Sequence, residues 1–413
     1  MKRTLYVESL INPGEEPLQG VRISIENGVI TRVEEEVLPN REDVSLPGKV
    51  CSPALFNSHD HLKYTWPEHL GEGRYANSYE WLPTLYREAE QKFLSRLALE
   101  DLYWLGTYKN LFAGVTTVAN HCRPLPQSFF DQFPIRILHR FRREIFVRED
   151  ARAHKMGLGA AEEAFIAKRE RMPLVVHIAE GVDRLTEEEV DVLDGLNGLF
   201  EGCVLVHAIN INQDQIRKIA SAGSSVVWCP VSNRFLFGRT APIQSLLTMG
   251  VNIALGTDST CTGAEDLRRE MEAASEELAG FPDSSRLLHE FCTINGARAF
   301  GLANLGRVAP GYSADLLAFE QSTDDPFDDL MRTGAEKFVF LMKDGQLLFR
   351  RCEVEMPFDN VLPEVSVVRI DDADFEVVGY PEQVLSRVAR LTDQPREAFP
   401  LGRMINVNRC ALA

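Results

Sequence analysis

The sequence of 413 residues contains no uncharged apolar run of about 18 residues, the length that a membrane-spanning helix needs. Positive charge is also scarce, with 44 lysines and arginines against 61 aspartates and glutamates and a net charge of -17. Such a surface repels polyphosphates and anionic lipids. We therefore expect neither a membrane protein nor a general nucleic-acid binder.

The eight cysteines include no CxxC pair, and the opening stretch MKRTLYVESLINPGEEP lacks the apolar run and cleavage site of a secretion signal. Both absences favour buried thiols in a reducing compartment, so we expect a cytoplasmic protein. The hydrophobic share of 45% and the charged share of 25% are ordinary for a folded globular chain and exclude disorder as its main state.

Two kinds of pattern divide the sequence. Residues 1–52 and 305–352 alternate apolar and polar positions, and Asn27-Gly28 marks a tight hairpin, as in half-buried strands. Across residues 53–304, apolar runs such as VVHIA and CVLVHAI alternate with amphipathic segments, which is typical of βα units around a parallel sheet. We predict an α/β protein, with a (β/α)8 TIM barrel over 53–304 and a small β-sandwich domain built from both termini.

A doubly wound sheet is the competing fold, but no GxGxxG follows an early strand. The remaining residues, 353–413, are expected to form an extra C-terminal segment. Within it, PEVSVVRI and DFEVVGY resemble strands, and PEQVLSRVARL predicts a helix. The expected apolar face of that helix carries Val384, Leu385, Val388 and Leu391.

Histidines and acids recur where apolar runs end. His59 and His61 in ALFNSHDHL are two apart, so both imidazoles point the same way from a strand. The series continues in PLVVHIAEG, CVLVHAINI and NIALGTDST with His177, Glu180, His207 and Asp258. Burying such groups without partners costs roughly 2 to 7 kcal/mol each. Because barrel strands end at one face, the set predicts a site for a divalent metal such as zinc, iron or manganese.

Taken one at a time, these residues have simpler interpretations. A lone HxH is more often a surface or core feature, a lone Asp258 could cap the next helix, and Asn233 in WCPVSNRFL could shape a turn or contact substrate. His121 and Arg123 follow the strand-like GVTTVANHC and would face the same mouth, touching either the substrate or a loop carbonyl.

A basic run follows soon after in the sequence. Arg140 or Arg142, if it points inward, could hold a carboxylate or phosphate of the substrate, whereas a run of this kind is usually a solvated face.

The ordered series resembles the amidohydrolase superfamily, in particular its branch of mononuclear deaminases and chlorohydrolases (TRZ/ATZ-like) that act on nitrogen heterocycles. The resemblance covers about residues 3–350. It rests on SPALFNSHDHL, GVTTVANH, HIAE, VHA, CPVSN, LGTDS and NGARAFGL with GRVAPGYSADLLAF.

The resemblance implies one divalent metal ion, with zinc expected and Fe2+ or Mn2+ as alternatives, held by His59, His61, His177 and Asp258. Glu180 would be the proton shuttle, Asp258 would accept a proton from the attacking water, and His207 would contact that water and the substrate. His207 could instead replace His177 as the third histidine ligand, and the sequence leaves this open.

Binuclear members of the superfamily use a carboxylated lysine. The corresponding stretch RILHRFRREIF (136–146) has no lysine, and Lys155 and Lys168 lie in a predicted helix, which favours one metal ion. We therefore predict a metal-dependent hydrolase of a small molecule, deaminating an aminated N-heterocycle with release of ammonia. A cyclic or linear amide hydrolase and a catalytically silent ligand-binding barrel are the alternatives, and a homo-oligomer is left open.

Overall fold

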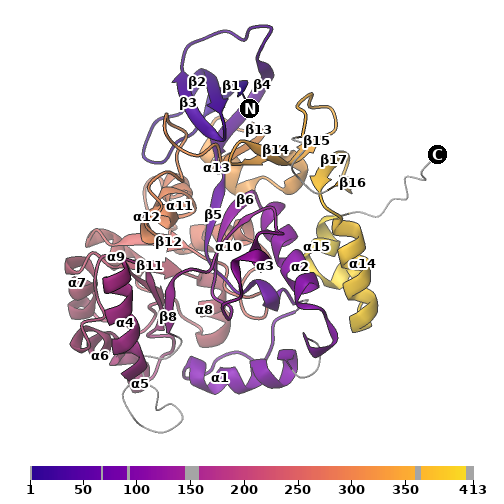
Figure 1. The fold of residues 1–413 in the computed structure, drawn as a ribbon. Coiled ribbons are helices and arrows are strands. Elements are labelled where there is room, and N and C mark those ends of the chain that lie inside the picture. The colour runs from indigo at the N-terminus through magenta and orange to yellow at the C-terminus, as the bar shows by residue number, and fades with distance from the viewer. Residues whose placement is uncertain (1, 67, 91–93, 145–157, 359–363, 406–413) are drawn as a thin grey trace.

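Strands from both ends of the chain form one nine-stranded sheet in the computed structural model, which describes all residues except 1, 67, 91–93, 145–157, 359–363 and 406–413 (Figure 1). Its order is β16-β17-β15-β14-β13-β4-β1-β2-β3. The strands are β1 (Lys2–Leu10), β2 (Leu18–Glu26), β3 (Val29–Glu34), β4 (Val44–Pro53), β13 (Leu316–Glu320), β14 (Phe338–Lys343), β15 (Gln346–Arg351), β16 (Val365–Ile370) and β17 (Ala373–Val378). The pairing of β1 with β4 is parallel, and the other neighbours in this sheet pair antiparallel.

The predicted hairpin at Asn27-Gly28 joins β2 to β3. Both residues have positive φ, 51° and 82°, as the two central residues of the turn type that matches strand twist require. Along β2, Val21, Ile23 and Ile25 are buried while Arg22 and Ser24 between them are partly exposed, which is the alternation expected of a strand with one face on a core.

The C-terminal segment continues this sheet with β16 and β17, and its helices α14 (Pro381–Thr392) and α15 (Pro400–Met404) lie against α2 (Leu99–Leu111) (Figure 1). Val384, Leu385 and Val388 are buried as predicted, but Leu391 is 42% exposed, so its placement on the apolar face was wrong. The buried stripe ends on Thr392, and at about 100° per residue Leu391 lies about a quarter turn away from the centre of that stripe. The boundaries of the three predicted units remain a prediction.

The middle of the chain forms a barrel of parallel strands, as predicted. One sheet has the order β12-β11-β10-β9-β8 and the other β5-β6-β7, and Asp60 pairs with Asp258 in a parallel bridge that links β5 to β12. The strands are β5 (Leu55–Asp60), β6 (Val115–Asn120), β7 (Arg136–Leu138), β8 (Arg142–Glu144), β9 (Leu174–Ile178), β10 (Cys203–His207), β11 (Ser225–Trp228) and β12 (Asn252–Leu255). All residues of β5, β6, β9, β10 and β11 are buried, as in strands covered on both faces.

Helices separate these strands and cover the barrel. They are α1 (Ser78–Leu85), α2, α3 (Gln127–Phe130), α4 (Leu158–Glu170), α5 (Arg184–Glu187), α6 (Glu189–Gly195), α7 (Gln213–Ser221), α8 (Pro230–Phe237), α9 (Ile243–Thr248), α10 (Leu267–Glu277), α11 (Ser284–Phe291), α12 (Ile294–Ala299) and α13 (Pro326–Arg332). Within the described part of the chain, no helix combines the length and apolar character needed to cross a bilayer.

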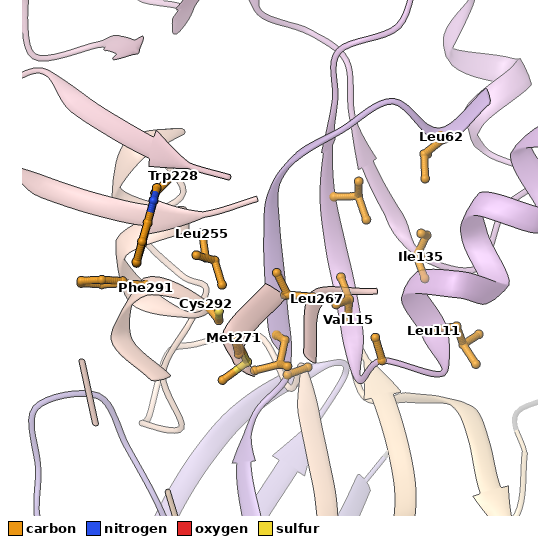
Figure 2. Packing of buried hydrophobic residues seen from close by; sticks show 14 of the residues in the cluster. Leu62, Leu111, Val115, Ile135, Trp228, Leu255, Leu267, Met271, Phe291 and Cys292 are labelled. Carbon is orange, nitrogen blue, oxygen red and sulfur yellow. The ribbon is translucent and has the colours of Figure 1, made fainter. Parts of the chain in front are cut away.

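The core lies between the strands and these helices. Figure 2 shows Trp228 of β11 and Leu255 of β12 beside Phe291 of α11, with Leu267 and Met271 of α10 close by. Each of these side chains is at most 1% exposed, and burying one of this size contributes roughly 1.5 to 3 kcal/mol. This packing holds the strand ends in fixed positions.

Candidate active site

Four side chains of the predicted metal site converge at the carboxyl ends of the barrel strands. The candidate ligand atoms of His59, His61 and His177 all lie within 4.8 Å of one another. Oδ1 of Asp258 lies 3.4 Å from Nε2 of His61 and 3.9 Å from Nε2 of His59. Residues from β5, β9 and the end of β12 therefore meet at one point.

The buried nitrogens of this cluster fit a divalent metal. Nε2 of His59 and Nδ1 of His177 are buried and have no hydrogen-bond partner among the described residues. Burial, reinforced by the neighbouring histidines, holds the pKa of both imidazoles well below the usual value. They are therefore neutral at physiological pH, which is the form that coordinates a metal. Neutral imidazoles beside a carboxylate are a ligand set that zinc prefers.

The carboxylate of Asp258 is charged and held in place. Burial would raise its pKa, but His61, His207 and a hydrogen bond from Ser232 outweigh that effect and lower it. Oγ of Ser232 donates to Oδ2 at 2.7 Å, and the backbone N–H of Ser259 donates to Oδ1 at 2.7 Å. Its carboxylate is thus fixed and negative before any ligand arrives.

Left-handed backbone occurs where the strands end. Ala179, His207, Ala208 and Asp258 have φ of 51°, 73°, 47° and 56°, although none of them is glycine. This conformation costs roughly 1 to 3 kcal/mol at each position and occurs at functional sites, where the surrounding structure fixes it. At Ala179 the N–H donates to Oε2 of the buried Glu189 at 2.6 Å, which stabilises the turn that aims the next residue, Glu180.

Glu180 and His207 face each other across the site, with 3.6 Å between Oε1 and Nε2. Burial raises the pKa of Glu180 to about 7, against an opposing influence from His207. Near neutral pH this carboxyl is therefore present in both protonation states. It can release and accept a proton under the conditions at which most enzymes work.

Asn233 contacts His207 directly. Its side-chain oxygen lies 2.8 Å from Nδ1 of His207, and its Nδ2 donates to Oγ1 of Thr240 at 3.2 Å. Since a carbonyl oxygen accepts, Nδ1 carries the proton and Nε2 presents its lone pair to the site. The buried Nε2 has no hydrogen-bond partner in the described part of the chain. This contact orients His207, and the predicted contact of Asn233 with substrate remains a prediction.

A cavity of about 480 Å3 opens onto these residues and is lined by His61, His177, Glu180 and Asp258. The predicted His121 and Arg123 line it as well. The ring centroid of His121 lies 4.5 Å from that of His177, and neither of its buried ring nitrogens has a partner among the residues described.

The inward-facing arginine was missed. Arg142 pairs with Glu163 at 2.5 Å and Arg140 is exposed, and neither lines the cavity, whereas Arg143 does. Successive residues of a strand face opposite sides, so the register of the short β8 decides which arginine points inward. The sequence contains no sign of that register.

A buried ion pair behind the histidines was also missed. Nζ of Lys109, on α2, lies 2.8 Å from Oδ2 and 3.0 Å from Oδ1 of Asp60, and the two residues are 1% and 0% exposed. Asn110 donates to Asp60 Oδ2 at 2.8 Å. Asp60 separates the two histidines on a strand, so its side chain points away from them and needs a partner, which was the available signal.

The lysines considered for a second metal give no support to one. Lys168 is on α4, where its ammonium donates to the backbone carbonyl of Asn197. Lys155 lies outside the described residues. Among the described residues, one set of three or more histidine, cysteine or acidic side chains is close enough together to hold a metal ion. It consists of His59, His61 and His177.

Known proteins with similar sequences indicate which family this site belongs to. A profile described as the amidohydrolase family matches residues 152–348. The 5-methylthioadenosine/S-adenosylhomocysteine deaminase of Pyrococcus furiosus is 25% identical over 344 residues, 71% of this chain and 80% of that protein. Residues 152–348 of this chain therefore form an amidohydrolase family domain. The 8-oxoguanine deaminase of Pseudomonas aeruginosa is 28% identical to this chain over 200 residues, 44% of each chain.

Solved structures share the fold of this chain. An adenosine deaminase from Xanthomonas campestris with bound zinc aligns with a TM-score of 0.75 at 18% identity, covering 94% of this chain and 97% of that one. Atrazine chlorohydrolase from Arthrobacter aurescens, complexed with zinc, aligns with a TM-score of 0.71 at 18% identity, covering 94% and 99%. The solved structures confirm the predicted fold, and the family match and the deaminase relatives confirm the predicted amidohydrolase domain and hydrolase class.

Proposed function

We propose that this amidohydrolase deaminates an aminated N-heterocycle by hydrolysis and releases ammonia. One divalent metal ion, zinc by preference, would be held by His59, His61, His177 and Asp258. The observation that carries the proposal is Glu180, a buried acid whose pKa lies near 7, in the same cavity as this ligand set. The deaminase names of the relatives and the zinc in the structural neighbours support it.

When bound, the metal would supply Lewis acidity that brings the pKa of a water towards 7. Asp258, charged and held by Ser232, accepts the proton that the attacking water releases. Protonated Glu180 donates to the ring nitrogen as the C–O bond forms and then assists transfer of a proton to the leaving amine. The C–N bond breaks, and water plus the amine become the oxo product and ammonia.

His207 would act on the oxygen. With Nδ1–H donating to Asn233, its Nε2 accepts a hydrogen bond from the attacking water and, once protonated, donates to the oxygen that develops on the ring carbon. Whether it also replaces His177 as a ligand stays open in the proposal. A cytoplasmic location and a homo-oligomer likewise remain predictions.

Hydrolysis of a cyclic or linear amide is the second candidate, because the same acid and base would serve it. A catalytically silent barrel is disfavoured, since the proposed proton shuttle and all proposed ligands are present and converge.

The test is a screen for ammonia release by zinc-loaded protein on aminated purines, pyrimidines and pterins, beside a panel of cyclic and linear amides. We expect ammonia from at least one aminated heterocycle, with Glu180→Gln losing turnover while keeping its metal. Carboxylate release from an amide, with no aminated ring accepted, would replace deamination by the second candidate.

A further inference from the structure

Cationic side chains gather in the cavity that holds the proposed catalytic residues. Lys63 follows β5, Arg123 follows β6 and Arg143 lies in β8, and all three line the cavity together with Glu180 and Asp258. Three cations against two acids are unexpected in a protein of net charge -17.

Arg143 is fixed in place by neutral groups, and no described residue supplies a counterion to its charge. Its guanidinium donates to the backbone carbonyls of Cys122 and His139, the latter at 2.7 Å, and stacks over Phe141 with 4.5 Å to the ring centroid. No carboxylate pairs with it within the described ranges, and its Nε is buried without a partner. A half-buried cation held by neutral groups is costly unless a ligand supplies the negative charge.

Two arginines of the consecutive strands β7 and β8 are neutralised. Arg136 contacts carboxylates of Asp315 and Asp344 at 2.7 Å each, and Arg142, next to Arg143, pairs with Glu163. Arg123, by contrast, is exposed at the cavity and has no hydrogen bond or ion pair to any described residue. Arg143 and Arg123 therefore present guanidinium groups to the cavity that no described carboxylate neutralises.

The remaining wall suits a flat ring. Tyr64, Trp81, Leu82 and Leu85 line the same cavity, and Nζ of Lys63 lies 4.5 Å from the centroid of the Tyr64 ring. Aromatic and aliphatic side chains of this kind pack against planar heterocycles. Glu180 comes from β9 and Asp258 follows β12, whereas the cations come from β5, β6 and β8. A substrate could thus meet the acids with one end and the cations with another.

We infer that the substrate carries an anionic group, a carboxylate or a phosphate, which Arg143 and Arg123 bind while the aminated ring carbon faces Glu180. The inference rests on the proposed function and names its substrate class. Guanidinium groups bind both anions through paired N–H donors, which a lysine cannot reproduce. Lys63 adds charge without that geometry.

The experiment compares matched substrates that differ in the anion. Adenosine, guanosine and cytidine are set against their 5′-monophosphates for the phosphate arm, and pterin against pterin-6-carboxylate for the carboxylate arm. Dissociation constants are measured by calorimetry on zinc-loaded Glu180→Gln protein, and kcat/KM on the zinc-loaded wild type. A charge-assisted hydrogen bond changes affinity by roughly ten- to a hundredfold, so we expect one anionic member to bind at least about tenfold tighter than its neutral partner.

Variants test whether Arg143 and Arg123 cause the preference for the anionic ligands. Arg143→Gln and Arg123→Gln should each reduce the ratio of anionic to neutral affinity by about tenfold, Arg143→Lys should retain part of it, and added salt should weaken it. Arg140→Gln is the matched control, because Arg140 is exposed in the same run and does not line the cavity. Thermal unfolding of each variant verifies folding.

The outcomes separate the two proposals. Turnover of neutral members with no preference for anions, or an equal ratio in all variants, would overturn the anion site and leave deamination intact. Tight, arginine-dependent binding of an anionic member without ammonia release would support the anion site and count against deamination. Binding of no member of any pair overturns the inference.

Discussion

Replacing Lys109 by methionine tests the buried charges behind the histidines. The ammonium of Lys109 and the carboxylate of Asp60 are 2.8 Å apart and almost fully buried, so the substitution leaves an uncompensated charge. Removing one partner of such a pair typically costs about 3 to 5 kcal/mol. Asp60 lies between His59 and His61, and its backbone carbonyl accepts the N–H of His121 at 2.8 Å.

The same change should weaken metal binding. Loss of residues that support metal ligands without binding the metal themselves typically weakens metal affinity by about 10- to 100-fold. Zinc affinity is measured by chelator competition, and stability by thermal and urea unfolding of the zinc-free protein, with Lys109→Met, Asp60→Asn and the double variant. The double variant should be less damaged than the sum of the two single variants, because no lone charge remains.

The surface ion pair of Lys218 with Asp191 supplies the control. Lys218→Met makes the same substitution in an exposed ion pair whose charged atoms are 2.7 Å apart. Exposed ion pairs contribute little to the free energy of unfolding. The Lys218→Met variant should leave unfolding and zinc affinity unchanged. Wild-type stability and zinc affinity in Lys109→Met, or strict additivity in the double variant, would refute the reasoning.

Three further predictions concern single side chains. Asn233→Leu removes the acceptor that orients His207, so kcat should fall on the order of tenfold or more while zinc content, measured by mass spectrometry, is retained. If protonated Glu180 is the donor, kcat/KM should fall as pH rises through about 7, and a profile flat from pH 5 to 9 would exclude that role. Burial raises the pKa of Glu270 to about 8, above its unfolded value, so the stability that the neutral carboxyl contributes is complete below about pH 4.5 and is lost as pH rises through 8. Urea unfolding should show a smaller pH dependence for Glu270→Gln than for the wild type.

The barrel and the convergence of its site residues were predictable from local patterns. Fully apolar runs ending in His177 and His207 predict buried parallel strands, and parallel strands in a barrel end at one face, so the polar residues after them had to meet. The hairpin at Asn27-Gly28 was predictable because both residues tolerate positive φ.

The features that could not be predicted from the sequence depend on tertiary contacts. The side of β8 on which Arg143 lies follows from strand register, and that register is set by pairing with β9. The partnership of Asp60 with Lys109 joins residues on a strand and a helix whose packing no local pattern specifies. Leu391 was misplaced because apolar character at helical spacing does not show where the centre of the buried stripe lies.

The most direct test of the central claim is the zinc content and zinc position of the purified protein, measured by elemental analysis and anomalous diffraction. The account predicts one zinc per chain, about 2.0 to 2.2 Å from nitrogen and oxygen atoms of His59, His61, His177 and Asp258, and no zinc in a His59→Ala/His61→Ala variant that still folds. A metal bound elsewhere in the chain, or full occupancy retained in that variant, would contradict it.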